Sequence, residues 1–181
     1  QGKHDEAVNR LTEGAAQHAS RAAEFWAAIG SVEAQSGNFD KAQAAYTRAA
    51  TKRPNDPLIK EELARALIAQ GSYAEALKAT DGAPSTDRRI RIVRGLARME
   101  LNQLAKAREE LAATERNGRF PAEAVVYLAM IDAAQGQRDT ARTMLESVAT
   151  TSKEWAALAQ GALGKLYVEE GREPEAVAAL I

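Results

Sequence analysis

The sequence predicts an all-α fold built from repeated helical hairpins, and three observations support this. Alanine occupies 40 of the 181 positions and aromatic residues make up only 5% of the chain, whereas strands favour β-branched and aromatic side chains. The other abundant residues, Leu, Glu, Arg, Lys and Gln, are strong helix formers. A short motif also recurs at an almost constant spacing, as is typical of stacked helical repeats.

The composition excludes several classes of protein. Lys and Arg number 24 against 25 Asp and Glu, so the net charge of −1 argues against a globally basic nucleic-acid binder. The apolar share of 45% is too high for a disordered chain. No apolar run approaches the length of a membrane span, so we expect no membrane insertion of this segment. Without cysteine, the chain has no disulfides and no thiol chemistry.

The recurring motif is a Gly or Asn followed five residues later by an Ala. The six copies occupy residues 2–7, 37–42, 71–76, 102–107, 136–141 and 171–176. Their closing alanines are 35, 34, 31, 34 and 35 residues apart. A fixed period in this range indicates a solenoid in which each repeat buries its apolar face against its neighbours.

Each period is interpreted as two helices. An apolar-periodic stretch ends at the Gly or Asn, which tolerates the left-handed backbone that closes a helix. A second amphipathic stretch begins near the acidic residue that follows, because a negative charge suits a helix N-terminus. The Ala that closes the motif is small, which indicates close approach of the two helices of an αα-hairpin.

The copy at residues 23–56 carries the most complete pattern. Its matching residues are Trp26, Ile29, Gly30, Gly37, Phe39, Ala42, Tyr46, Ala49 and Pro54. This spacing resembles the W…L-G…A…F/Y…A…P pattern of the tetratricopeptide repeat family. Glu33 stands where that family usually has an aromatic residue. The resemblance extends over essentially the whole chain and implies a right-handed αα-superhelix of about eleven antiparallel helices.

The repeat boundaries follow from the motif spacing. We expect the second helix of a truncated repeat at 1–22, repeats at 23–56, 57–87 (short), 88–121 and 122–156, and a repeat truncated at its end at 157–181. Solenoid ends require polar caps. Because the chain opens and closes inside repeats, we expect it to be a fragment of a longer array.

The repeat at 57–87 is irregular and precedes an arginine-rich helix. Asp81 to Ser85 contains Gly and Pro, which predicts that the second helix of this repeat, from Tyr73 to about Thr80, is short. The next helix carries arginines at positions 88, 89, 91, 94 and 98. Either these side chains extend outward along their stems, or the helix is rotated so that Val93 and Leu96 enter the core and an arginine stripe is exposed.

The sequence offers no catalytic or metal-binding constellation. His4 and His18 are too far apart to share a metal on one helix, and the chain has no third His. Gly161 to Lys165 echoes a phosphate-binding loop but lacks its spacing and its Ser or Thr. We therefore predict no enzymatic activity and no cofactor or metal for this segment.

The resemblance implies that the first helices of the repeats line a concave face. Candidate partner-binding residues on these helices recur at i, i+3 and i+7, so each set shares one helical face. They are Arg65, Ile68, Arg89, Ile92, Leu96, Met99, Val126, Tyr127 and Met130. The predicted function is a non-catalytic protein–protein interaction scaffold that binds a partner peptide or helix in a concave, partly apolar groove.

Two other functions stay open on the sequence. The segment could be a structural or assembly arm of a bacterial envelope machine, such as pilus assembly or exopolysaccharide export, by analogy with resembling proteins. It could instead be an accessory domain of an enzyme whose catalytic part lies outside it. Open repeat ends would also permit self-association. The sequence leaves the location open between the bacterial cytoplasm and the periplasm or envelope.

Overall fold

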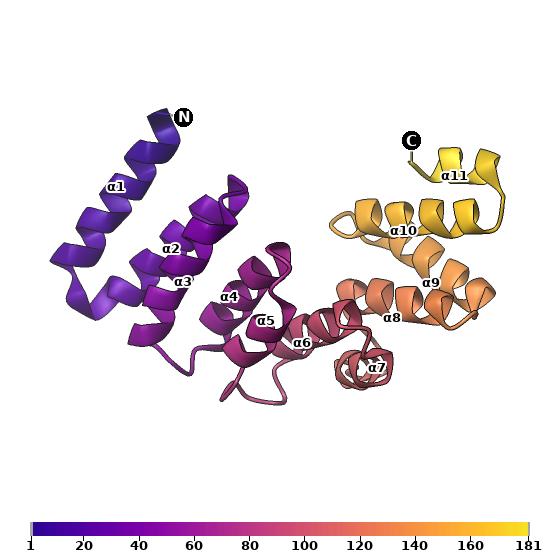
Figure 1. Ribbon diagram of the computed structural model, residues 1–181, viewed down its shortest axis with the longest axis horizontal. Coiled ribbons are helices and arrows are strands. Elements are labelled where there is room, and N and C mark those ends of the chain that lie inside the picture. The colour runs from indigo at the N-terminus through magenta and orange to yellow at the C-terminus, as the bar shows by residue number, and fades with distance from the viewer. Residues whose placement is uncertain (1, 181) are drawn as a thin grey trace. The chain divides into compact units, whose positions relative to one another are not determined.

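The computed structural model describes residues 2–180, with the side chain of Leu180 left out, and this part of the chain folds into eleven α-helices. It contains no β-strand, and its one isolated bridge joins Arg116 to Arg119. The predicted all-α fold class and the number of helices are therefore confirmed. Figure 1 shows the helices following one another as short antiparallel pairs.

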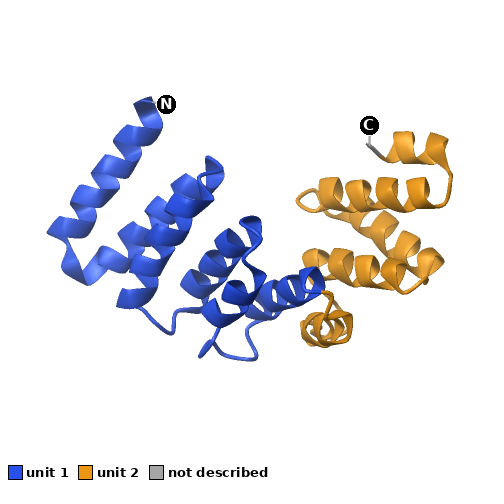
Figure 2. Cartoon of the chain, in the orientation of Figure 1, with its two compact units in different colours: residues 1–101 blue, residues 102–181 orange. Residues whose placement is uncertain are grey.

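The chain divides into two compact units, residues 1–101 and 102–181 (Figure 2). Unit 1 contains α1 (Gly2–Gln17), the 3-10 turn η1 (Ala19–Arg21), α2 (Ala22–Gln35), α3 (Phe39–Lys52), α4 (Pro57–Ala69), α5 (Tyr73–Ala79) and α6 (Arg88–Glu100). Unit 2 contains α7 (Leu104–Ala112), α8 (Ala122–Ala134), α9 (Arg138–Thr151), α10 (Ala156–Glu169) and α11 (Glu173–Leu180). None of these helices combines the length and the apolar character needed to cross a bilayer.

The first helix of each pair ends where the motif predicts. Gly37, Gly71, Gly136 and Gly171 have φ angles of 71° to 82°, and Asn102 has a φ of 57°. After α2, the N–H of Asn38 donates to the carbonyl of Glu33 at 2.9 Å, which closes the helix end. These backbone angles explain why Gly or Asn recurs at these five positions.

The alanines that close the motif lie in the contacts between paired helices. Ala42, Ala76, Ala107, Ala141 and Ala176 are each at most 4% exposed. Larger apolar side chains pack around them and form several clusters in unit 1 and a cluster around Leu145 and Leu163 in unit 2. The prediction that these positions are small because helices approach closely is confirmed.

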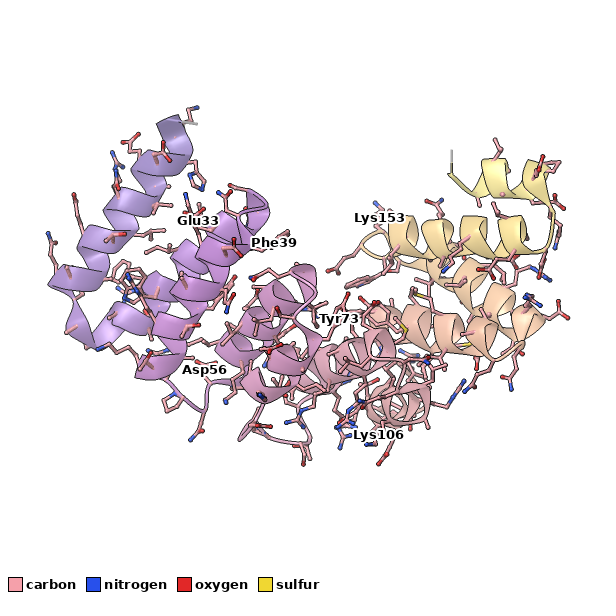
Figure 3. All side chains as sticks on the ribbon, viewed as in Figure 1. Glu33, Phe39, Asp56, Tyr73, Lys106 and Lys153 are labelled. Carbon is pink, nitrogen blue, oxygen red and sulfur yellow. The ribbon has the colours of Figure 1, made fainter. Side chains whose placement is uncertain are left out.

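Two first helices of unit 1 begin with the same acidic cap. The carboxylate of Asp56 accepts the N–H groups of Leu58 and Ile59 at 3.0 and 3.4 Å, and Pro57 occupies the first turn (Figure 3). Asp87 accepts the N–H of Arg89 at 2.9 Å in the same way at the start of α6. These caps fix where α4 and α6 start and hence which residues share a face.

The short helix α5 ends against two cationic side chains. It spans only Tyr73–Ala79, as predicted for this repeat. Lys60 Nζ donates to the carbonyl of Asp81 and, at 3.5 Å, to that of Ala79. Arg94 donates at 2.8 Å to both the hydroxyl and the carbonyl of Thr80, which is 1% exposed. Positive charge at a helix C-terminus is stabilising, so these contacts compensate for the shortness of α5.

Replacing Arg94 with Met should lower the free energy of unfolding of unit 1 by about 1–2 kcal/mol, because the buried Thr80 hydroxyl and carbonyl lose their charged donor. Urea unfolding followed by tryptophan fluorescence measures this effect. The control Lys78→Met removes an exposed cation from α5 itself and should change stability by less than about 0.5 kcal/mol. Equal effects of the two changes would contradict the proposed role of Arg94.

The arginines of α6 do not form a fully exposed stripe. Arg89 is exposed, whereas the arginines at 88, 91, 94 and 98 are half-buried. Val93 is fully buried in a cluster with Ala64 and Leu67, and Leu96 is half-buried. The helix therefore buries Val93 while arginine stems extend along the surface, so each of the two expected arrangements is correct in part.

Candidate functional site

The predicted partner-binding residues all lie on first helices, but they divide between the two units. In unit 1, Arg65 and Ile68 lie on α4. Four candidates lie on α6, namely Arg89, Ile92, Leu96 and Met99. In unit 2, the remaining three lie on α8. Each group therefore lies on a separate surface, the α4–α6 face in unit 1 and a surface of α8 in unit 2.

The α4–α6 face presents apolar and cationic side chains together. Arg65, Ile68, Leu96 and Met99 are half-buried, and the side chain of Arg89 is 49% exposed. Ile92, in contrast, is only 4% exposed. The prediction that Ile92 lines a groove is corrected, because its side chain is taken up by packing and leaves almost no surface for a partner.

A nearly buried carboxylate organises the arginines of this face. Glu61, 6% exposed, lies 3.0 Å from Arg65 Nε and 3.7 Å from Arg89 Nε. Arg89 also contacts the Asp87 carboxylate at 3.2 Å. Burial raises the pKa of Glu61 above its ordinary value of 4.5, and this effect outweighs the opposing attraction of Arg65. Both guanidinium groups thus have a fixed orientation and retain exposed surface.

The shifted pKa of Glu61 predicts a specific pH dependence. An acid whose pKa is raised by folding destabilises the folded state when it is ionised, and this cost disappears as pH falls from the folded pKa toward the unfolded value. In Glu61→Gln the group no longer titrates. The stability of the wild-type chain relative to Glu61→Gln should therefore increase as pH falls from 7 toward about 4.5. Urea midpoints of both proteins at several pH values test this, and a pH-independent difference would refute it.

Two of the three candidates on α8 are core residues. Val126 is 0% exposed and packs in the main cluster of unit 2 with Leu145 and Leu163, and Tyr127 is 7% exposed. The prediction that Val126 and Tyr127 line a binding groove is therefore corrected for the same reason as for Ile92. Met130 is half-buried and keeps part of its surface.

Met130 borders an apolar cleft between α8 and α10 in unit 2. The cleft has a volume of about 120 Å³. It is lined by Met130, Ala133 and Ala134 of α8, Leu145 of α9, and Ala162, Lys165, Leu166 and Glu169 of α10. Among these, only Met130 is a binding residue predicted from the sequence. Nine residues before the closing Gly or Asn, the chain has Ala162 on α10 and Ala28 on α2, whereas the other repeats have Glu62, Val93 and Tyr127. A small residue at this position is a signal for the cleft, but Ala28 shows that the signal is not specific to α10.

Two buried carboxylates at one repeat position were also missed. Glu33 of α2 (Figure 3) and Asp132 of α8 lie four residues before the closing glycine and are 4% and 5% exposed. His4 of α1 lies 3.2 Å from Glu33, and Arg108 of α7 lies 2.5 Å from Asp132. In both cases the carboxylate connects a first helix to the preceding second helix, which is a structural role.

The described residues offer no arrangement for catalysis at a metal. Between Gly2 and Leu180 there is no group of three or more His, Asp or Glu side chains that could hold a metal ion. His4 is half-buried against Glu33, and His18 stacks on Phe25 with ring centroids 6.1 Å apart. Gly161 lies within α10, not in a phosphate-binding loop. Two features that can contact another molecule are the α4–α6 face and the α8–α10 cleft.

Comparison with family models gives one consistent result. Three models described as tetratricopeptide repeat match residues 1–57, 33–99 and 122–147. Together these matches cover well over half of the chain. No curated protein sequence matches it.

Solved structures of repeat proteins have the same fold. TTC0263, a thermophilic tetratricopeptide repeat protein of Thermus thermophilus, is 24% identical over 87% of each chain, with a TM-score of 0.77. A tetratricopeptide repeat protein of Parabacteroides merdae is 15% identical over 96% of this chain and 77% of its own, with a TM-score of 0.70. The pilF protein of Pseudomonas aeruginosa is 16% identical over 99% of this chain and 90% of its own, with a TM-score of 0.62.

Proposed function

Because this chain belongs to the tetratricopeptide repeat family, whose members are generally non-catalytic scaffolds for protein interaction, we propose that it holds a segment of a partner protein on its first helices. The surfaces we assign to this role are the α4–α6 face and the α8–α10 cleft. One observation carries the proposal: first helices in both units keep large apolar side chains half-exposed beside charged ones.

The chemistry of these surfaces suits a peptide. Ile68, Leu96 and Met99 provide apolar contact area on the α4–α6 face, and Met is adaptable in shape. Arg65 and Arg89 are planar donors held by Glu61, so they can bind carboxylates or backbone carbonyls of a partner with little loss of side-chain freedom. A partner would gain affinity from apolar contacts and orientation from the charges.

Crosslinking combined with mass spectrometry, on the full-length protein in its native host, tests this proposal. Crosslinks to partner proteins should concentrate on α4, α6, α8 and α10. Charge-inserting variants Ile68→Glu, Met99→Glu and Met130→Glu should each lose most of the partner crosslinks while retaining a helical circular dichroism spectrum.

Matched controls insert the same charge on exposed sites of second helices. Ala44→Glu on α3 and Thr143→Glu on α9 should leave partner crosslinks unchanged. Crosslinks that concentrate on second helices, or that persist in all three first-helix variants, would overturn the proposal. The likeness to pilF supports the fold alone, so it does not favour an assembly arm over this function.

A further inference from the structure

We propose that the α8–α10 cleft takes up one apolar side chain, of about the size of Leu, Ile or Met, from a partner segment that carries an acidic residue beside Lys165 and a basic residue beside Glu169. This inference rests on the proposed function and adds the chemistry of the ligand. It follows from the size, the lining and the charges of the cleft.

The size and lining of the cleft determine which partner side chain, here called the anchor, it can hold. Its floor contains Leu145 and Leu166, which are 1% and 2% exposed, so the cleft reaches down to the core of unit 2. Three alanines on its walls leave a volume of about 120 Å³. Apolar cavities of roughly 150 Å³ bind one benzene-sized molecule. The cleft therefore accepts one aliphatic or thioether side chain, and it is too small for the length of a lipid acyl chain.

The cleft is associated with a small residue at one repeat position, Ala162 on α10, where α2 also carries an alanine, Ala28. Ala162 occupies the position that carries Glu62 on α4, where the Glu62 carboxylate accepts a hydrogen bond from Tyr46 at 3.1 Å. Because Ala162 lines the cleft, a larger side chain at this position would take up part of its volume. The missing volume on α10 is thus available to a side chain supplied by another molecule.

The charged residues at the rim give the ligand a direction. Lys165 and Glu169 are exposed and lie one helical turn apart, about 6 Å along α10. Within residues 2–180, neither side chain makes an ion pair or hydrogen bond. A cation and an anion one turn apart along the α10 edge of the cleft favour a segment that runs beside α10 with the complementary order of charges around its anchor. This requirement identifies a polypeptide rather than an uncharged apolar ligand.

Two short peptides of identical composition provide the probe. Each has one central leucine, with Asp residues before it and Lys residues after it in the first peptide and the reverse order in the second. Methyl NMR of Met130, Ala162 and Leu166 in the full chain reports binding. One peptide should bind several-fold more tightly than the other, and the double variant Lys165→Glu/Glu169→Lys should reverse this preference. Absence of methyl shifts with both peptides, or an unreversed preference, would overturn the inference.

Filling the cleft provides the second arm of the test. Ala162→Tyr introduces the residue that α8 carries at the same repeat position, Tyr127, and should weaken peptide binding about tenfold or more. The control Ala157→Tyr adds the same side chain at an exposed site of α10 and should leave binding unchanged. If Ala162→Tyr does not fold, Ala134→Leu at the exposed edge of the cleft serves the same purpose. Unaltered affinity in a folded, filled variant would refute the anchor site.

The crosslinking experiment separates this inference from the proposed function. If partner crosslinks on the α4–α6 face are lost in Ile68→Glu but unaffected by Ala162→Tyr, the scaffold function stands and the anchor site is refuted. If crosslinks to the native partner are lost in Ala162→Tyr and retained in Ala157→Tyr, the scaffold function and the anchor site are both supported. If partner crosslinks avoid every first helix, both are refuted.

Discussion

Replacing Gly30 with alanine is expected to lower the free energy of unfolding of unit 1 by about 1–3 kcal/mol. A Cβ atom at this position would lie 2.7 Å from Cδ1 and Cε1 of Tyr46, inside van der Waals contact. The ring has little room to move, because Tyr46 is 1% exposed and its hydroxyl donates to Glu62 at 3.1 Å. The usual gain from replacing a helical glycine with alanine offsets only part of this clash.

The repeat pattern supplies a rescuing change. At the position equivalent to Gly30, α8 carries Ala129, and at the position equivalent to Tyr46, α9 carries Leu145. Ala129 and Leu145 are 0% and 1% exposed and belong to one core cluster, so alanine and leucine are compatible there. In a Tyr46→Leu background, Gly30→Ala should therefore lower the free energy of unfolding much less than it does in the wild type. The coupling energy between the two positions in this double-mutant cycle should be about 1 kcal/mol or more.

The two tryptophans allow each unit to be followed separately. Trp26 lies in unit 1 and Trp155 in unit 2, so a Trp155→Phe background reports on unit 1 through Trp26. The control Gly161→Ala lies in unit 2 and is followed through Trp155 in a Trp26→Phe background. It adds a Cβ with nothing within 4 Å and should increase the stability of unit 2 by about 0.5–1 kcal/mol. A Gly30→Ala protein as stable as the wild type would show that the close contact with Tyr46 does not constrain this position.

The hairpins were predictable because a few positions tolerate only one kind of residue. Gly71 and Asn102 adopt positive φ angles that most residues avoid, and Ala76 and Ala107 lie where two helices leave no space for a larger side chain. These constraints come from backbone conformation and volume, so they are visible in the sequence as a fixed spacing. The short helix before Pro84 follows from the same reasoning.

The surface available to a partner was predicted less well. Helix α8 is apolar around most of its circumference, and eight of its 13 residues are buried. Spacing at i, i+3 and i+7 therefore does not show which apolar residues of α8 face solvent. The predicted groove residues Val126 and Tyr127 pack in the interior instead. The cleft beside Met130 depends on the small size of Ala162 on another helix, which no pattern within α8 contains.

The buried carboxylates illustrate a further limit of sequence reasoning. Glu33 is recognisable as a departure from the repeat pattern, but its partner His4 lies 29 positions earlier on α1. Asp132 likewise depends on Arg108 of α7. A charged residue in a helix is normally exposed, so only the contact between helices shows that these two carboxylates are buried and paired.

Replacing Arg108 with Met is expected to lower the free energy of unfolding of unit 2 by about 3 kcal/mol, because it leaves the carboxylate of Asp132 buried without its cation. Arg108 Nη2 lies 2.5 Å from Asp132 Oδ1 and 2.9 Å from Gln135 Oε1, and the side chain of Asp132 is 6% exposed. Urea unfolding followed through Trp155 in a Trp26→Phe background measures the effect. The control Arg119→Met removes an exposed arginine of unit 2 and should change stability by less than about 0.5 kcal/mol.

The double variant Arg108→Met/Asp132→Leu distinguishes loss of a paired charge from loss of packing. The repeat at 57–87 carries Leu67 at the position equivalent to Asp132, and Leu67 is 5% exposed in its core cluster. Replacing a buried ion pair by apolar residues of similar size is often neutral or stabilising. The free energy of unfolding of the double variant should therefore lie within about 1 kcal/mol of the wild-type value. It should be well above the value for Arg108→Met alone. If the double variant is as unstable as Arg108→Met, the contribution of Arg108 comes from the packing of its stem between α7 and α8, and the buried charge of Asp132 does not determine the stability of unit 2.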